Sequence, residues 1–484
     1  MGSLHRVLRV APAVALALAA CSATPAGRPN VVLIVIDTVR ADRLSGYGYD
    51  RPTTPHIDAL GERGVRFSNA FSTSSWTLPA HASLFTGLFP IEHGATQERT
   101  RLEAGASTLA EILGAHGYAT FAASDNPLVG PGTGLDRGFD AFVETWRGKH
   151  GPRHPEPDRH ANLLAVTRFL ESLEPGRPFF VFVNYIEGHG PYAPPEPQRS
   201  RFLAPGTSPE AVRSALRRDA VGYYLDPASI PPAEFAVLND LYDGEVARVD
   251  ALVGALVDAL EQSGRLDATL LVITSDHGEN IGDHGHFRHV FSLYGTTVRI
   301  PLIVVLPDGQ RAGEVRPEPA SLVDLFATLL AQCGIEPPSG ATTGRDLLAD
   351  AGDASEAPIY AEYYTPLQAL GLFSPEEFAA NRARLSPFLR RLRSVQVGDW
   401  RLIAASDGSH ELFDLSSDPG ERRNLAGSPS SLERERRLAA LLDAFVERAG
   451  GAPPLPDAPG TPGAAFGDLD PESARRLRAL GYVR

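Results

Sequence analysis

Carboxylates and a histidine stand just after two apolar runs of the sequence. Asp37 follows the run 31–36, and the pair Asp276-His277 follows the run 270–273. Such runs are typical of strands buried on both faces of a parallel sheet, whose carboxyl ends meet at one edge. Carboxylate oxygens suit a hard divalent cation, and a histidine also admits zinc. We predict that these three side chains hold one divalent metal ion, although each aspartate alone could be a helix N-cap.

A hydroxyl side chain, Thr77, precedes a run of small and apolar residues that predicts a helix. Pro79 suits the first turn of that helix. A hydroxyl at a helix N-terminus lies where backbone N–H groups stabilise negative charge. A metal-bound hydroxyl there would be partly deprotonated at neutral pH. Thr77 is therefore the predicted nucleophile, and the alternative is a plain threonine N-cap.

The elements that must position these residues alternate between strand and helix. Apolar runs at 179–183 and 302–305 repeat the strand pattern. Valines and leucines recur at three- and four-residue steps over 246–260, which predicts an amphipathic helix. This alternation indicates an α/β fold with a doubly wound, mixed or parallel sheet flanked by helices. From about residue 395, short alternating runs predict a small C-terminal antiparallel-sheet subdomain.

The N-terminal residues 1–20 have the pattern of a signal peptide, because arginines precede an apolar stretch too short to span a bilayer. The stretch ends Leu-Ala-Ala-Cys, which resembles the bacterial lipobox with Cys21 as the lipidated residue; an ordinary secretory signal is the alternative. We predict a catalytic domain at 21–350, a subdomain at 358–448, and a linker with a terminal helix at 449–484. The expected location is the bacterial cell envelope, lipid-anchored on the periplasmic or cell-surface side.

The composition excludes two classes of protein. Lys and Arg number 45 against 59 Asp and Glu, for a net charge of −14, which argues against a nucleic-acid binder. Hydrophobic residues make up 43% and charged residues 21%, which excludes wholesale disorder. A single lysine, Lys149, is present, so arginine supplies almost all of the positive charge.

The order of the motifs resembles the sulfatases, a family of the alkaline phosphatase superfamily. Residues 28–42 are similar to the opening of the family, and 77–87 to its nucleophile signature. The His-Gly-Pro sequence at 189–191 matches a substrate element, 275–285 the second metal motif, and 411–425 the tail hairpin. The resemblance implies a sulfatase-like fold and a metal-dependent hydrolase of sulfuric or phosphoric esters. The substrate would be a small-molecule, glycan or lipid ester.

Three positions depart from the family pattern. Thr77 stands where sulfatases carry the Cys or Ser that is oxidised to formylglycine, so this maturation is not expected. Superfamily members that act on phosphoryl groups use an unmodified Thr or Ser. Thr38 stands where many sulfatases carry a second metal-binding aspartate and could supply a weaker oxygen, and His81 replaces the signature arginine.

The two lysines that the family places on sulfate are also missing. One position falls within 123–127, and the other falls on His289. The remaining candidates for anion contacts are His81, His189, His289, Asn126 or an arginine. Histidine near neutral pH can protonate a leaving oxygen.

The sequence therefore predicts an exported, membrane-tethered ester hydrolase with one divalent cation. Ca²⁺ is favoured, and Mn²⁺, Mg²⁺ and Zn²⁺ remain open. The predicted metal ligands are Asp37, Thr38, Thr77, Asp276 and His277. The predicted catalytic residues are Thr77, His81, His189 and His289, with Asn126 and His189 binding substrate. The alternatives are an envelope phosphoryl-group transferase, since water and an acceptor alcohol compete for one covalent intermediate, and a lipoprotein that binds an anionic glycan without cleaving it.

Overall fold

The computed structural model describes residues 27–147, 155–338, 340, 342–350, 356–365, 373–451 and 470–480. The predicted signal peptide, Cys21 and most of the predicted linker lie outside these residues. Among the described helices, none is both long and apolar enough to cross a membrane.

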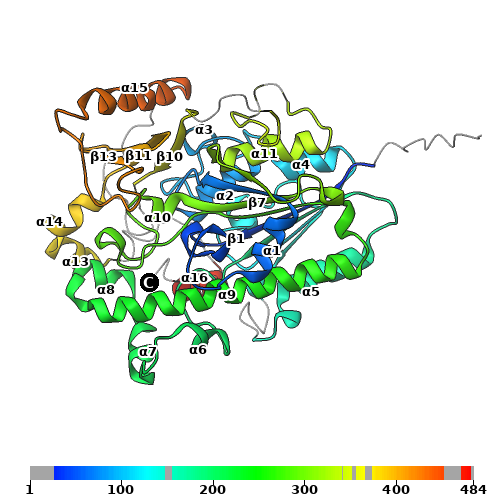
Figure 1. Ribbon diagram of the computed structural model, residues 1–484, viewed down its shortest axis with the longest axis horizontal. Coiled ribbons are helices and arrows are strands. Elements are labelled where there is room, and N and C mark those ends of the chain that lie inside the picture. Colours follow the sequence, from blue (N-terminus) through cyan, green and yellow to red (C-terminus); the bar gives the residue numbers. More distant parts are fainter. Residues whose placement is uncertain are drawn as a thin grey trace, which may run out of the picture.

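A nine-stranded mixed sheet forms the centre of the molecule (Figure 1), in the order β4-β3-β5-β1-β6-β7-β2-β8, with β9 paired to β2. The strands are β1 Asn30–Ile36, β2 Val65–Phe71, β3 Ala119–Ser124, β4 Ala141–Glu144, β5 Phe179–Tyr185, β6 Thr269–Ser275, β7 Arg299–Val305, β8 Glu314–Arg316 and β9 Ala320–Ser321. The five strands from β4 to β6 run parallel, whereas β7 runs antiparallel to both neighbours. This confirms the predicted mixed α/β sheet.

Helices cover both faces of this sheet. In Figure 1, α2, α4 and α11 lie on one side, and α1, α5 and α9 on the other. The long α9 contains the predicted amphipathic segment in its second half and begins well before it. The helices up to the end of the sheet are α1 Pro55–Arg63, α2 Thr77–Thr86, α3 Pro90–His93, α4 Leu109–Ala115, α5 Ala161–Ser172, α6 Gln198–Phe202, α7 Pro209–Ala215, α8 Ala220–Leu225, α9 Pro232–Gln262, α10 Gly295–Val298 and α11 Leu322–Gln332.

A second, four-stranded antiparallel sheet follows, in the order β10-β11-β12-β13. Its strands are β10 Ile359–Tyr363, β11 Leu392–Val397, β12 Trp400–Ala405 and β13 His410–Asp414. The predicted C-terminal sheet is therefore confirmed, but β10 lies well before the residue where the sequence pattern changes. The remaining helices are α13 Pro375–Ala380, α14 Arg382–Leu385, α15 Leu432–Arg448 and α16 Pro471–Leu480.

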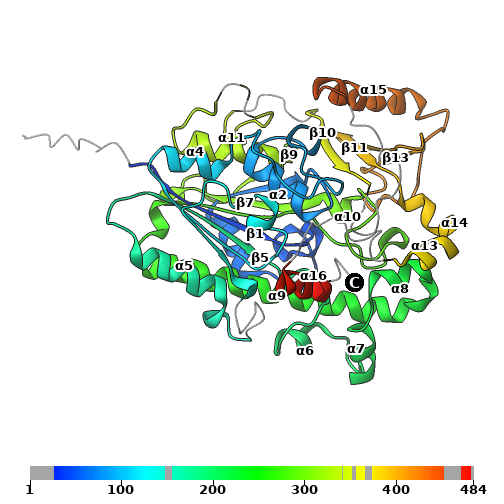
Figure 2. The same ribbon diagram turned by 180° about the vertical axis from the view of Figure 1, so that it is seen from behind.

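One part of the second sheet packs into the core of the large sheet, and another part forms a separate hydrophobic cluster with α15. Ile359 and Ile403 of the second sheet belong to the same buried cluster as the strands of the large sheet. The terminal helix α16, red in Figure 2, also returns to the large sheet, where Leu477 joins this core and Asp470 forms an ion pair of 3.1 Å with Arg147. The chain thus closes back on the domain that carries the predicted site.

Candidate active site

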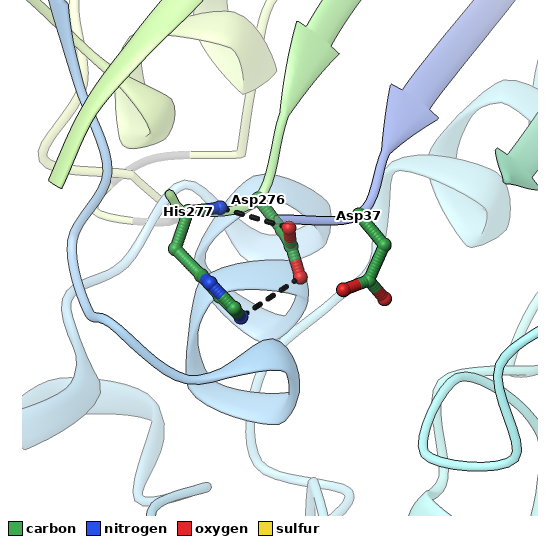
Figure 3. Close-up of side chains that lie close together, drawn as sticks. All are labelled: Asp37, Asp276 and His277. Carbon is green, nitrogen blue, oxygen red and sulfur yellow. Dashed lines mark hydrogen bonds and ion pairs between the residues drawn. The ribbon is translucent and has the colours of Figure 1, made fainter. Parts of the chain in front are cut away.

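The ends of β1 and β6 bring the predicted metal ligands together. In the parallel pairing of these strands, Ile36 lies opposite Ser275, so Asp37 and Asp276 leave neighbouring strands at the same level (Figure 3). The ligand atoms of Asp37, Asp276 and His277 lie within 4.8 Å of one another, and all three residues are buried. The prediction that these side chains converge follows from strand register, because residues after paired parallel strands meet at one edge.

Hydrogen bonds orient both carboxylates. Asp276 Oδ1 accepts from the backbone N–H groups of Thr38, at 3.0 Å, and His277, at 2.8 Å. Asn126 Nδ2 donates to Asp37 Oδ2 at 2.5 Å. The other two oxygens, Asp37 Oδ1 and Asp276 Oδ2, are buried and make no hydrogen bond within the described residues. One oxygen of each carboxylate is thus held by hydrogen-bond donors. The other oxygen of Asp276 lies 3.3 Å from His277 Nε2 (Figure 3).

The electrostatics of this cluster favour a cation. Burial, followed by the charge of Asp276, raises the pKa of Asp37 well above its usual value, and the Asn126 hydrogen bond opposes this only in part. Burial lowers the pKa of His277 to about 4, although Asp276 opposes the shift. Two buried carboxylates without a counter-charge are costly, whereas a divalent ion would stabilise both in the ionised form. The donor set of two carboxylates and a neutral imidazole therefore fits the predicted metal.

Thr77 is the first residue of α2, and every residue of this helix is buried. Its Oγ1 lies 3.3 Å from His277 Nε2. His277 Nδ1 must carry a proton, because it lies 2.9 Å from the Gly278 carbonyl oxygen, which can only accept. The lone pair of Nε2 therefore faces the hydroxyl. The structure places the predicted nucleophile against the predicted metal cluster.

His81 lies one turn after Thr77 on α2. Its Nδ1 donates to the Thr77 carbonyl oxygen at 2.9 Å and lies 3.7 Å from Asp276 Oδ2. The ring meets Phe85 and Phe182 edge-on, and burial lowers its pKa. A neutral His81 thus braces the start of α2. Its predicted contact with a substrate anion remains a prediction.

His189 and His289 lie beside the cluster. The ring centre of His289 is 4.6 Å from that of His277 and 5.0 Å from that of His189. The loop carrying His189 can pack this closely because residue 188 is a glycine. A Cβ at this position would lie only 2.4 Å from the Asp37 carbonyl oxygen. Burial, together with the charges of His289 and Arg288, lowers the pKa of His189 well below its usual value. Both predicted histidines therefore reach the site.

Asn126 and Thr38 each donate a hydrogen bond to a carboxylate of the predicted metal cluster. Asn126 Oδ1 accepts from the Leu128 N–H at 2.8 Å while its amide nitrogen holds Asp37, so both ends of the amide are engaged. Thr38 has a left-handed backbone with φ of 57°, and its buried Oγ1 makes no hydrogen bond within the described residues. The substrate contact of Asn126 and the metal contact of Thr38 stay predictions.

The structure also contains a buried cluster that we did not predict, made of Asp125, His160 and Glu187. His160 Nε2 lies 3.0 Å from Glu187 Oε1 and 3.5 Å from Asp125 Oδ2. Thr145 Oγ1 donates to Asp125 Oδ1 at 2.5 Å and Asn162 Nδ2 to Asp125 Oδ2 at 2.8 Å, so both oxygens of Asp125 are engaged by donors. The cluster joins the segments just before Asn126 and His189 and thereby fixes their position. No periodic pattern could have revealed it, since its members come from three distant segments.

Comparison with known proteins identifies the family. Residues 29–335 match the family model described as Sulfatase. The chain belongs to the sulfatase family. It is 26% identical to the multifunctional alkaline phosphatase superfamily protein PehA of Trinickia caryophylli over 497 residues, covering 87% of this chain and 94% of that protein. It is 23% identical to the N-acetylglucosamine-6-O-sulfatase of Bacteroides thetaiotaomicron over 517 residues, covering 89% of each.

The fold of this sulfatase is also found in solved structures. It resembles the phosphonate monoester hydrolase of Agrobacterium radiobacter with a TM-score of 0.70 and 21% identity, covering 87% of this chain and 96% of that one. The family is one of metal-dependent ester hydrolases, and the buried cluster around Asp37 and Asp276 can hold a metal ion. The chain is therefore a hydrolase of sulfuric or phosphoric esters.

Proposed function

We propose that this sulfatase cleaves its ester through an unmodified Thr77 hydroxyl, with Asp37, Asp276 and His277 holding one divalent cation. The observation that carries the proposal is the position of Thr77 Oγ1, buried at the first residue of α2 and 3.3 Å from His277 Nε2. Bound among these residues, a cation would supply positive charge for the hydroxyl and for the ester oxygens.

Thr77 attacks the sulfur or phosphorus atom of the ester in this proposal. The hydroxyl gives up its proton to water, a bond forms between Oγ1 and the central atom, and the bond to the leaving oxygen breaks. Water then cleaves the Thr77 ester and restores the hydroxyl. The N-terminus of α2 contributes backbone N–H groups that stabilise negative charge at this oxygen.

His289 is the better placed of the two histidines to protonate the leaving oxygen. Glu279 Oε1 lies 3.4 Å from His289 Nδ1 and would compensate the charge of a protonated ring. His189 Nδ1 donates to the Gly190 carbonyl oxygen at 2.7 Å, so a neutral His189 presents only an acceptor at Nε2. His189 therefore contacts the ester in this proposal, and His289 delivers the proton.

The substrate in this proposal is an ester of sulfuric or phosphoric acid carried by a sugar or another small organic group. The sulfated-sugar name of the Bacteroides relative and the phosphonate name of the Agrobacterium neighbour support both acid types. We further propose that the protein is exported and anchored through Cys21, which is supported by the lipobox-like sequence alone.

Replacement of Thr77 tests the mechanism. We expect Thr77→Ala to lower kcat at least about a thousandfold on 4-nitrophenyl sulfate or bis(4-nitrophenyl) phosphate, and Thr77→Ser to keep measurable turnover. The matched control is Thr86→Ala in the same helix, where the hydroxyl only donates to the Ala82 carbonyl oxygen, at 2.6 Å. This control should keep its turnover. Full activity of Thr77→Ala, or wild-type activity that survives complete removal of metal by a chelator, would overturn the proposal.

A further inference from the structure

The guanidinium of Arg288 is packed beside His189, in a space that only a glycine leaves open. A Cβ at Gly190 would lie 1.0 Å from Arg288 Nη1 and 2.0 Å from Cζ. The guanidinium also lies over the rings of Tyr192, at 4.9 Å, and Phe287, at 5.1 Å. The side chain is therefore held between the loop 189–192 and Phe287, close to His289 in the sequence.

The positive charge of Arg288 is not neutralised by a carboxylate within the described residues. Its Nη1 is buried without a hydrogen bond, and no carboxylate forms an ion pair with it. By contrast, Arg40 pairs with Asp42 and Asp283, at 2.8 Å each. A half-buried cation without a counter-charge is unfavourable, and an anionic ligand would remove this cost.

The backbone of Arg288 is fixed in a conformation that side chains rarely adopt, with φ of 71°. Its N–H donates to the Asn280 carbonyl oxygen at 2.9 Å, and its own carbonyl oxygen accepts from Asn280 Nδ2 at 3.1 Å. Thr296 Oγ1 in turn donates to Asn280 Oδ1 at 2.7 Å. Such a conformation persists only when the surrounding structure determines it, and it clusters at binding sites.

We propose that Arg288 binds an anionic oxygen of the substrate ester and supplies positive charge there, since the residues that the structure describes include no lysine. This inference rests on the proposed function, since it places the ester beside His189. A guanidinium can donate two parallel hydrogen bonds to a sulfate or phosphate group, and this geometry makes arginine a strong ligand for both. The substrate is therefore an ester that keeps at least one negative oxygen: a sulfate monoester, or a phosphate monoester or diester.

Inhibition by inorganic sulfate and phosphate tests the role of Arg288. We expect Arg288→Gln to lower kcat/KM about 10- to 100-fold and to raise the inhibition constants of both anions by a similar factor. Arg288→Lys should recover part of both, because it keeps the charge. The control is Arg213→Gln on α7, where an exposed arginine pairs with Glu210 at 2.7 Å. This control should change neither kcat/KM nor the inhibition constants. Unchanged anion inhibition in a folded Arg288→Gln protein would overturn the inference.

Gly190→Ala offers an independent test, because the new Cβ must displace the guanidinium without removing its charge. We expect it to weaken anion inhibition in the wild type and to add little in an Arg288→Gln background. An equal loss in both backgrounds would mean that the substitution acts through the loop, and would count against Arg288.

Calorimetric titration with sulfate separates this inference from the proposed function. Sulfate binding that is lost in Arg288→Gln supports the anion site even if the wild type cleaves no ester. An active wild type whose anion binding does not depend on Arg288 keeps the proposed function and overturns the inference.

Discussion

The replacement Asp37→Asn should raise the free energy of unfolding of the metal-free protein and lower that of the metal-loaded protein, each relative to the wild type. The ligand oxygens of Asp37 and Asp276 lie within 4.8 Å of each other, and both carboxylates are fully buried. When both are ionised, Coulomb repulsion at an effective dielectric constant of about 20 amounts to about 3.5 kcal/mol. Asparagine has nearly the same shape, keeps an acceptor for Asn126 and removes this repulsion. After chelation we therefore expect Asp37→Asn to be more stable than the wild type, by about 1–3 kcal/mol at pH 8.

The difference in free energy of unfolding between metal-free Asp37→Asn and the metal-free wild type should increase with pH. Burial and the charge of Asp276 raise the pKa of Asp37, so the folded wild type holds a proton that the unfolded chain releases. Its free energy of unfolding therefore falls as pH rises from the unfolded pKa, about 3.9, toward the raised folded value. The free energy of unfolding of Asp37→Asn does not fall in this way, because asparagine does not titrate. The variant should therefore exceed the wild type in stability by less as the pH is lowered.

With metal bound, the wild type should be more stable than Asp37→Asn. A cation at a hundred times its dissociation constant stabilises the folded protein by about 2.7 kcal/mol. The variant has lost one of two carboxylate ligands, so it should gain little.

The assay is urea unfolding followed by circular dichroism, from pH 5 to pH 8, with chelator and with saturating Ca²⁺ or Mn²⁺. The control is Asp267→Asn, which replaces an exposed aspartate in the turn before β6. It should leave the free energy of unfolding unchanged both with chelator and with metal. A chelated Asp37→Asn protein that is less stable than the wild type at pH 8 would refute the electrostatic reasoning. Equal stabilisation of both proteins by metal would refute the assignment of the ligands.

Three further predictions follow from the site, the buried cluster and the N-terminus. His289→Ala should lower kcat about 10²- to 10⁴-fold on alkyl esters and far less on 4-nitrophenyl esters, whose leaving group needs no acid; an equal loss on both would argue against proton donation. Burial alone would lower the pKa of His160, but the carboxylates of Asp125 and Glu187 raise it. Stabilisation by His160 is therefore complete below about pH 6.5 and lost as pH rises through the raised folded value. His160→Gln should thus lower the unfolding free energy by about 1–3 kcal/mol at pH 6 and by less at pH 9, and a loss that does not vary with pH would contradict this. Cys21→Ser should move the full-length protein from the membrane to the soluble fraction of the producing bacterium; retention in the membrane would exclude the lipid anchor.

Four strands of the large sheet, β1, β5, β6 and β7, were predictable because a strand buried on both faces requires a continuous apolar run. Residues 31–36 and 270–273 show such runs, and they became β1 and β6. The second sheet was only partly predictable. Its first strand, β10, is buried along its whole length, but it contains Tyr360 and Glu362, so it lacks the uninterrupted apolar run. Glu362 is buried there because it forms an ion pair of 3.1 Å with Arg393 on the next strand.

The sequence by itself was enough to predict that Asp37, Thr77 and Asp276 lie close together in the structure. Asp37, Thr77 and Asp276 stand at the ends of local elements, and the ends of neighbouring parallel strands must meet at one edge. Only the tertiary structure decided which charges are compensated. His160, Asp125 and Glu187 meet from three separate segments. Arg288 forms no ion pair with any carboxylate of the described residues, although the chain is acidic overall. Pairing of charges depends on distances of a few ångströms between segments far apart in the chain, and no local pattern of residues encodes those distances.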